Sequence, residues 1–518
     1  MKFLSIACAL IGILVFSCSG QKDEEPLKIG FGKADLSRAC ILEDPVSDAI
    51  SQDFRDKYRR EEKFAISDRV EGRWRPGSGG TRKLVDSLFV TAMYGEDENG
   101  PWIILTLDQM ILNYGDVDVM MHPLTHELGI PKERIVLLPS HSHATPPLDP
   151  GILSEVVLEA ATRARDDRVG VEIAFLNLQL DGKKYLINRR VYVDGIGSRT
   201  VMFNDGCEVY DDHLDASAHI RDWIVNLGTD PERFCGDGQR YVADGGVDSA
   251  LQALFIRDRQ TGKLKGSFTR FAAHSVIVSS KVVNGDVSGD FTGYLKKRLE
   301  EKLGGVALFG QGPSGDLRPL NKEYSHAFAK SYGQKLADLL VADYGNLEWQ
   351  ALTSQKFFTQ AVEMELLDGI LLSTEQVEKE MVALEAAFDR ETDPEKRRQL
   401  QNRFWGLYRT PANHRMVRPE WKQEGALGLQ LYALKLNDQV LLAAQGEVFH
   451  EIGAKMLEPF RDHHPVLVTI ANEYISYLPT DEERLRGGYE PSVCIVVPGS
   501  PDTLIKASHR LLERIYGE

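Results

Sequence analysis

The organisation of this chain is decided by the stretch Leu137-Leu138-Pro139-Ser140-His141-Ser142-His143-Ala144-Thr145-Pro146-Pro147. The apolar run 135–138 predicts a buried strand that ends at a proline. Because alternate side chains at a strand end point the same way, both histidines could face one cavity. Neutral imidazole is a common zinc ligand, so a His-x-His pair at a strand terminus can supply two nitrogens. On its own, the pair also fits two structural histidines.

Length and composition are those of a globular protein that can bury a large core. The chain has 518 residues, of which 42% are apolar and 27% are charged. Its formal net charge of −16 argues against a nucleic-acid partner and against electrostatic binding to anionic membranes.

The first residues have the pattern of an export signal. Lys2 provides a short positive region, and residues 3–16 form an apolar run too short to span a bilayer. The end of this run resembles a bacterial lipobox with Cys18 as the lipidated residue. We therefore expect a signal peptide at 1–17, an acidic tether at 18–26 and a lipid anchor at Cys18, which places the protein in the bacterial outer membrane or at the cell surface. A plain secretory signal is the alternative.

The segment around His141 resembles the Ser-His-Thr-His-Ser-Gly-Pro motif of the neutral/alkaline, non-lysosomal ceramidases, a family of zinc-dependent amidohydrolases. Ser142 stands in place of the family's Thr, and Ala144-Thr145 replace its Ser-Gly. Five motifs, this one included, recur in family order between Gly30 and Glu490. The resemblance implies an α/β fold, with one large catalytic domain over 27–518 whose mixed β-sheets are flanked by helices. Because the chain ends at residue 518, we expect this domain without the C-terminal β-sandwich of family members.

Four residues match the family's metal ligands. Ala272-Ala273-His274 resembles its Phe-Ala-x-His strand end, and Gln445-Gly446-Glu447 resembles its Pro-Gly-Glu-Phe segment. The stretch 472–483 resembles Asn-x-Tyr-x-x-Tyr-x-x-Thr-x-Glu-Glu, in which the second tyrosine binds the metal. The resemblance thus implies zinc held by His141, His274, Glu447 and Tyr477. Without it, His274 fits a core histidine at a strand end, and Glu447 fits a carboxylate favoured by a helix dipole.

Four further residues match family positions that contact the substrate. Asn188-Arg189-Arg190 resembles the family's Asn-Arg-Ser, and Tyr489-Glu490 matches its Tyr-Glu. Gly32 lies in a strand similar to the family's opening Gly-x-Gly-x-Ala-Asp-Ile. The resemblance implies His143 as general acid/base, Arg189 and Tyr489 as oxyanion stabilisers, and close approach of substrate at Gly32. A surface arginine at 189 and a packing glycine at 32 are the alternatives.

Several features depart from the family pattern. Arg318 stands where the family has a serine in Gly-Asp-Val-Ser-Pro, so no serine nucleophile is available in register, whereas a metal-activated water needs none. Residues 191–245 indicate a Gly- and Asp-rich insertion that shapes the binding site, and a disulfide between Cys207 and Cys235 is possible there. A helical pair, His122 and His126, imitates a zinc motif, but without its glutamate the pair fits surface histidines better.

These observations predict a zinc-dependent hydrolase in which a metal-activated water attacks an amide or ester, as in an N-acyl sphingosine-like lipid. Two alternatives stay open. The same centre could act on a carbohydrate or glycolipid, because the pocket departs from the family at Arg190 and Arg318. The chain could also be a non-catalytic surface binding lipoprotein that keeps the fold, although retention of all four ligand candidates speaks against this.

Overall fold

The computed structural model describes residues 27–42, 83–193, 197–200, 209–210, 241–242, 245–278, 286–320, 323–393 and 417–517, with a few positions between 396 and 407. The expected signal peptide, the tether and Cys18 lie outside the described residues. So do Cys207, Cys235 and most of the expected insertion.

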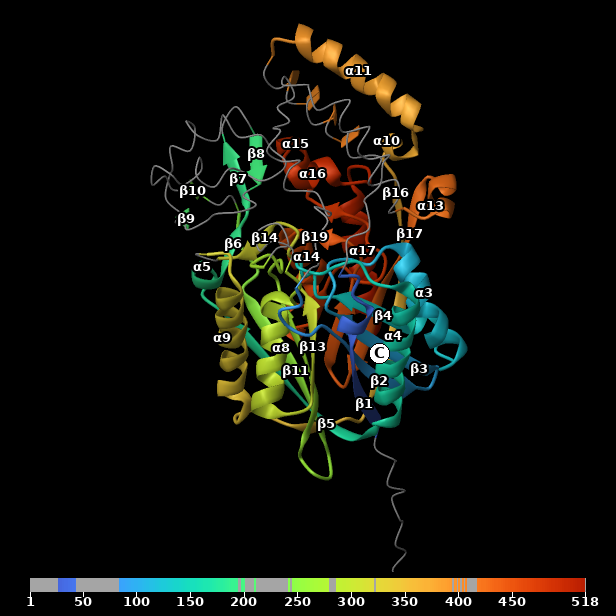
Figure 1. Ribbon diagram of the computed structural model, residues 1–518, viewed down its shortest axis with the longest axis vertical. Coiled ribbons are helices and arrows are strands. Elements are labelled where there is room, and N and C mark those ends of the chain that lie inside the picture. The colour runs from blue at the N-terminus through green and yellow to red at the C-terminus, as the bar shows by residue number, and fades with distance from the viewer. Residues whose placement is uncertain are drawn as a thin grey trace, which may run out of the picture.

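A large mixed sheet forms one half of the molecule (Figure 1). Within the described residues it has nine strands, and its first and last members are β13 and β4. In spatial order they are β13 (Val306–Gln311), β12 (Leu264–Phe271), β11 (Ala250–Asp258), β5 (Val169–Gln179), β1 (Lys28–Asp35), β2 (Phe89–Asp97), β3 (Gly100–Leu107) and β4 (Ile135–Pro139), with β15 (Gln350–Ala351) beside β5.

Two parallel pairs lie at the ends of this otherwise antiparallel sheet. Strand β3 pairs with β4, and β12 pairs with β13. The chain makes each parallel connection through a helix, α3 (Tyr114–His126) in the first case and α8 (Asp290–Leu303) in the second. Since parallel neighbours end at the same edge of a sheet, the segment after β4 starts beside the end of β3, and the segment after β12 starts beside the end of β13.

A smaller sheet packs against the large one. Its strands are β16 (Gln355–Glu365), β17 (Ala426–Leu436), β18 (Gln439–Ala443) and β20 (Val466–Val468). One apolar core joins both sheets, and it includes Phe31 and Leu138 from the large sheet together with Tyr432 and Val468 from the small one. Burial between the sheets therefore fixes one half of the molecule against the other.

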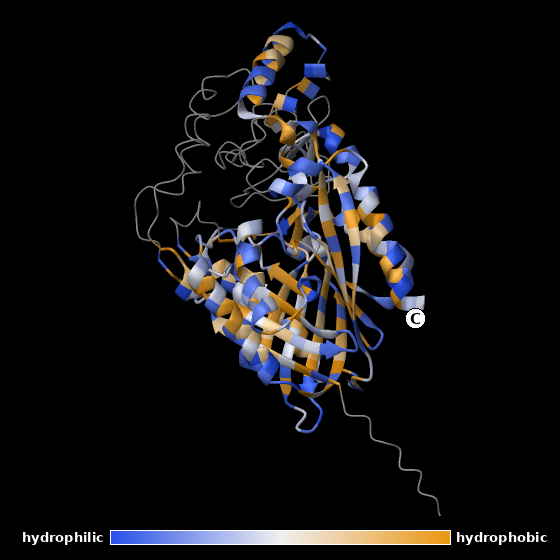
Figure 2. Cartoon of the chain, turned by 90° about the vertical axis from the view of Figure 1, so that its right-hand side faces the viewer, coloured by the Kyte–Doolittle hydropathy of each residue, from blue (hydrophilic) through white to orange (hydrophobic). Residues whose placement is uncertain are grey.

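Helices cover the outer faces of both sheets. The helices α3 and α4 (Pro150–Asp166) pack on β1 to β3, and α8 and α9 (His326–Tyr344) pack on β11 to β13. On the small sheet, α14 (His450–Leu457) and α17 (Ser500–Gly517) share a third core with β17 and β18. In Figure 2 the central strands are largely hydrophobic, whereas the outer helices carry polar residues along one side. This architecture confirms the predicted α/β class with mixed sheets flanked by helices.

An arm projects between β16 and β17 (Figure 1, top). It contains α10 (Asp368–Leu371) and α11 (Thr374–Arg390), and its hydrophobic cluster of Val377, Met381 and Phe388 is separate from the main cores. Helix α11 begins with a capping box, in which Ser373 and Gln376 bond reciprocally. No helix in the described part of the chain is both long and apolar enough to cross a bilayer.

Candidate metal centre

His141 sits directly after β4, in a backbone conformation that directs its ring inward. Its φ of 61° lies in the left-handed region, which non-glycine residues seldom adopt. The Nδ1 atom lies 2.8 Å from the carbonyl oxygen of Met110. Because a carbonyl only accepts, Nδ1 carries the proton and Nε2 keeps a lone pair.

His274 follows β12 and has the same arrangement. Its Nδ1 lies 2.6 Å from the carbonyl oxygen of Ser314 and 3.0 Å from that of Leu317, so Nδ1 is the donor here as well. The side chain has no exposed surface, and burial lowers the pKa of His274 to about 4, with Arg189 contributing in the same direction. The ring is therefore neutral near pH 7, with its Nε2 lone pair directed at the centre.

Glu447 brings a carboxylate to the two imidazoles. It opens the short strand β19 (Glu447–Val448), which pairs in parallel with β21 (Tyr477–Leu478) so that Glu447 lies opposite Tyr477. Its Oε1 accepts a hydrogen bond of 2.7 Å from the Tyr474 hydroxyl. Its Oε2 lies 2.8 Å from Nε2 of His274 and 3.2 Å from Nε2 of His141.

These short contacts bring lone pairs together. Oε2 of Glu447 is buried, and within the described residues no hydrogen-bond donor serves it. Burial alone would raise the pKa of Glu447, while charge on His141 and His274 would hold it well below its usual range. His274 is neutral, however, and an uncharged imidazole attracts a carboxylate only weakly. It therefore does not supply the charge that would lower the pKa of Glu447. A cation between Oε2 and the two Nε2 atoms would supply that charge.

Two further side chains border the same point. The Tyr477 hydroxyl lies 3.3 Å from Nε2 of His274, and Nε2 of His143 lies 3.4 Å from Nε2 of His141. Tetrahedral zinc with bonds of about 2.0–2.2 Å separates its ligand atoms by roughly 3.3–3.6 Å, close to most of these spacings. The three histidines could hold a metal ion, since their ligand atoms lie within 4.8 Å of one another.

The predicted metal ligands and the predicted acid/base thus come together from four segments of the chain, although their individual roles stay predictions. His143 and Tyr489 are half-buried, whereas His141, His274, Glu447 and Tyr477 are buried. The accessible side of the centre is therefore formed by His143 and Tyr489. The ring of Tyr489 meets the ring of Tyr477 edge-on, with centroids 5.7 Å apart.

Arg189 is buried beside Tyr477 and is not a surface arginine. Its guanidinium donates to the Tyr477 hydroxyl at 3.1 Å, to the Gly315 carbonyl oxygen at 2.8 Å and to Glu490 at 2.9 Å. Burial opposes its charge, but Tyr477, Glu490 and Glu447 keep the pKa of Arg189 above its usual value. The guanidinium thus supports the phenol that borders the metal centre.

Glu490 connects this arginine to the wall of the site. Its second oxygen accepts from Arg190 at 2.6 Å and from the Thr200 hydroxyl at 2.7 Å, and Arg190 also pairs with Glu483. Arg190 therefore fixes the hairpin of β7 (Arg190–Val193) and β8 (Gly197–Thr200) against α16 (Tyr489–Val493). At Arg190, where the sequence departs from the family pattern, the structure thus has a buried network of ion pairs.

Gly32 has the packing contact that the sequence left open beside a substrate contact. A Cβ built at Gly32 would lie 2.0 Å from the carbonyl oxygen of Ala160 in α4. Gly30 meets Ala164 of the same helix in the same way. The two glycines therefore let α4 approach β1 closely, and the substrate contact at Gly32 stays a prediction.

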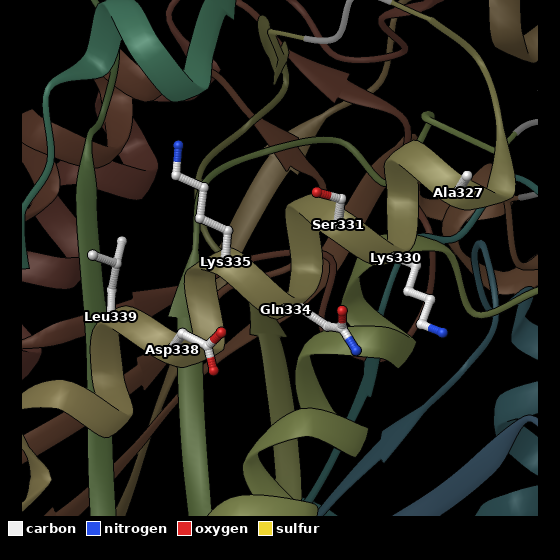
Figure 3. Close-up of a pocket in the computed structure, with 7 residues that line it drawn as sticks. All are labelled: Ala327, Lys330, Ser331, Gln334, Lys335, Asp338 and Leu339. Carbon is white, nitrogen blue, oxygen red and sulfur yellow. The ribbon is translucent and has the colours of Figure 1, made fainter.

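The structure also locates the helical histidine pair and Arg318. His122 and His126 are exposed on α3 with their rings stacked at 4.3 Å, as the surface alternative requires. Arg318 lies in β14 (Leu317–Pro319), is fully buried and donates to the Tyr324 hydroxyl at 2.6 Å. A surface pocket runs along α9, lined by residues such as Lys330, Gln334 and Asp338, and none of the predicted site residues lines it (Figure 3).

Three contributors to the site escaped the sequence interpretation. Tyr474 bonds Glu447, and Asp316 holds His450 through both carboxylate oxygens, at 2.9 Å to the backbone nitrogen and 2.5 Å to Nδ1. Asn472 bonds the backbone of Leu137 in β4. The first tyrosine of the Asn-x-Tyr-x-x-Tyr motif was a usable signal for Tyr474, whereas no local pattern marks His450.

Comparison with known proteins places the fold. The sequence matches no protein-family model and no curated protein. The structure resembles the crystal structure of neutral ceramidase from Pseudomonas aeruginosa, with 16% identity, a TM-score of 0.56 and coverage of 95% of this chain and 75% of that chain. It also resembles a ceramidase complexed with C2, with 14% identity, a TM-score of 0.57 and coverage of 95% and 76%. The chain therefore has a neutral ceramidase-like fold, as its motifs implied.

Proposed function

We propose that this protein is a zinc-dependent hydrolase that cleaves an amide or ester bond in an N-acyl lipid of the ceramide type. The observation that carries the proposal is Oε2 of Glu447, which is buried, receives no donor from the described residues and faces the Nε2 atoms of His141 and His274. The fold shared with ceramidases supports the choice of substrate class.

In this proposal His141, His274, Glu447 and Tyr477 hold the metal. Bound zinc supplies Lewis acidity that polarises a substrate carbonyl and lowers the pKa of a water. Burial raises the pKa of Tyr477 well above its usual value, while Arg189 acts in the opposite direction by donating to the phenol oxygen. Arg189 is thus a positioning residue that favours the ligand form of Tyr477.

His143 and Tyr489 act on the substrate from the accessible side of the centre. The imidazole of His143 takes a proton from the attacking water and returns it to the leaving nitrogen or oxygen. The phenol of Tyr489 donates to the oxygen that gains negative charge as the carbonyl is attacked. Neither role needs a serine at position 318, because the nucleophile is water.

Metal analysis tests this proposal. Protein purified without chelator is expected to contain about one zinc per chain, and His141→Ala is expected to lose it. His122→Ala is the matched control, because it removes an exposed histidine from α3 and should keep the zinc. No metal in the wild type, and none taken up from added zinc, would contradict the proposal and favour a surface binding protein.

A substrate panel then separates the remaining alternatives. We expect the zinc-loaded protein to cleave an N-acyl sphingosine or a simple ester, and not a glycoside. Cleavage of glycosides alone would favour the carbohydrate or glycolipid alternative. That alternative stays open because the sequence departs from the family at Arg190 and Arg318, both of which are buried.

We also propose export to the bacterial surface with lipidation at Cys18. The support is the signal-like segment of the sequence. Palmitate labelling of expressing cells should mark the wild type and not Cys18→Ser, and equal labelling of both would contradict the anchor.

A further inference from the structure

The two oxygens of Glu447 have different surroundings. Oε1 accepts a hydrogen bond of 2.7 Å from the Tyr474 hydroxyl, and both side chains are buried. Oε2 lies between two imidazole nitrogens and receives no donor within the described part of the structure. The Tyr474 hydroxyl therefore bonds Oε1 of Glu447 and leaves Oε2, the oxygen that faces the centre, without a donor.

We propose that Tyr474 is a positioning residue of the metal centre, whose hydroxyl engages Oε1 of Glu447 so that Oε2 alone binds the metal. The inference rests on the proposed zinc site and adds the residue that sets its carboxylate geometry. Hydrogen bonds from outside the ligand sphere fix ligand orientation, and losing one typically weakens metal affinity by about 10- to 100-fold.

The direction of the hydrogen bond follows from the chemistry of both groups. An ionised carboxylate only accepts, so the phenol must be the donor. The hydrogen bond therefore runs from the Tyr474 hydroxyl to Oε1 of Glu447, which leaves Oε2 directed at the two imidazoles.

The backbone holds Tyr474 in this direction. Its N–H donates to the carbonyl oxygen of Leu112 at 2.8 Å, in the same segment whose Met110 carbonyl bonds His141. On either side, Asn472 and Ser476 have φ values of 54° and 67°. These fixed turns aim the ring at Glu447, so Tyr474 loses little freedom when the metal binds.

The test compares two buried tyrosine hydroxyls. Tyr474→Phe removes the donor to Glu447, and Tyr332→Phe removes a buried hydroxyl that donates to the carbonyl oxygen of Tyr185 at 2.6 Å and touches no ligand candidate. Competition against a chromophoric chelator should give a zinc Kd raised about 10- to 100-fold in Tyr474→Phe. In Tyr332→Phe the Kd should stay within about twofold of the wild type, because the lost hydrogen bond does not reach the ligands.

The cobalt spectrum adds a readout of geometry. In the wild type, Co²⁺ should give the intense visible bands of a four-coordinate site. In Tyr474→Phe the freed Oε1 should join the metal, which raises the coordination number and weakens those bands. This measurement needs only the folded fraction of each variant, so a poorly expressed Tyr474→Phe protein still gives an answer.

Each outcome has a distinct meaning. If the wild type binds zinc and Tyr474→Phe shows the same Kd and cobalt spectrum, the positioning role is wrong and the proposed function stands. Equal weakening in Tyr474→Phe and Tyr332→Phe would also overturn it, because a general loosening would explain both. A wild type that binds no zinc would overturn the proposed function and this role together.

Discussion

Individual side chains at the centre are oriented through the polar atom that faces away from it. Nδ1 of His141 bonds Met110, Nδ1 of His274 bonds Ser314, and Oε1 of Glu447 accepts from Tyr474. In each case the protein satisfies one polar atom and leaves the other directed inward. A metal would therefore meet lone pairs that are already aligned, at little cost in side-chain entropy.

The role of His143 can be separated from that of the ligands. His143→Gln keeps a polar side chain but loses the titrating group, so kcat should fall by about 10²- to 10⁴-fold while one zinc is retained. Metal content and turnover measured on the same preparation check this. A loss of zinc would show instead that His143 is a ligand, as its place among the three clustered histidines also allows.

The pair of His450 and Asp316 predicts a pH-dependent contribution to stability. Burial lowers the pKa of His450, but Asp316 outweighs it and raises the pKa above the ordinary value. Burial opposes the charge of Asp316, but His450 holds the pKa of this carboxyl below its usual value. Asp316 therefore stays ionised near neutral pH. Because the folded-state pKa exceeds the unfolded value of about 6.5, the stabilisation is complete below that pH and is lost as pH rises through the folded-state pKa.

We therefore expect His450→Gln to lower the free energy of unfolding more at pH 6 than at pH 9, measured by urea unfolding. His509→Gln is the control, because the His509 ring contacts the carbonyl oxygen of Lys455 and no carboxylate. An equal loss at both pH values in His450→Gln would contradict the contribution of this ion pair.

A site residue could be predicted from the sequence only where a local pattern marks it. His141 and His274 end apolar strands, so a local pattern locates them. The hydrogen bonds that orient them do not follow from local pattern. The carbonyl oxygen of Ser314 that accepts from His274, for example, lies 40 positions later in the chain. The packing partner of Gly32 could not be predicted either, because the helix that packs on it lies more than a hundred residues later in the chain.

Among the elements, the connection from β20 to β21 contributes most to the site. It contains three non-glycine residues with positive φ, Ile470, Asn472 and Ser476, and His141 on the facing segment is a fourth. Such conformations cost on the order of 1–3 kcal/mol each and persist only where the surroundings enforce them. Here the connection must reach β4, Leu112 and Glu447 within a few residues, which regular structure could not achieve.

Asn472 is the residue through which this connection can be tested. Asn472→Ala removes the acceptor of the Leu137 N–H and places alanine at φ 54°, so the free energy of unfolding should fall by roughly 2–4 kcal/mol. Zinc affinity should fall as well, because His141 and Tyr474 lose a common support.

A matched substitution isolates the effect on the site. Asn437 has φ 51° and accepts from the Thr353 N–H in the turn between β17 and β18, where its side chain bonds residues 351–354. Asn437→Ala should cost similar stability and leave the zinc Kd unchanged. If Asn472→Ala also left the Kd unchanged, the connection would have no part in holding the centre.

Elements were predictable where burial and turns coincide. Strand β11 matches its apolar run from Ala250 to Asp258 end to end, because a charged turn closes it. Boundaries are less predictable, since the apolar residue Tyr185 ends the helical turn α5 (Gly182–Tyr185) and the strand β6 begins only at Leu186. The order of the strands could not be predicted from the sequence, because the position of β5 between β11 and β1 depends on pairings with distant segments.

On the scale of the whole molecule, the centre lies where the two sheets meet. His141 and His274 follow strands of the large sheet, whereas Glu447 and Tyr477 lie in connections of the small one. A bound metal would therefore bond both halves, and its binding energy would add to folding stability.

Metal removal should lower the stability of the whole chain. With zinc at a thousandfold excess over Kd, the stabilisation is about 4 kcal/mol, so chelation should shift the denaturation midpoint downward in one cooperative transition. Denaturant titrations with and without zinc check this. His141→Ala should show no zinc-dependent shift, and a shift as large as that of the wild type would mean that zinc acts elsewhere.

The contact of Asn472 with β4 also bears on solubility. Strand β4 is the last strand of the large sheet, and its run Ile135-Val136-Leu137-Leu138 is strongly apolar. Asn472 bonds both the N–H and the carbonyl oxygen of Leu137, and Pro139 has no N–H to offer. Open strand edges of this kind recruit other chains into aggregates, so the residue that supports the metal centre also blocks a site of intermolecular β-pairing.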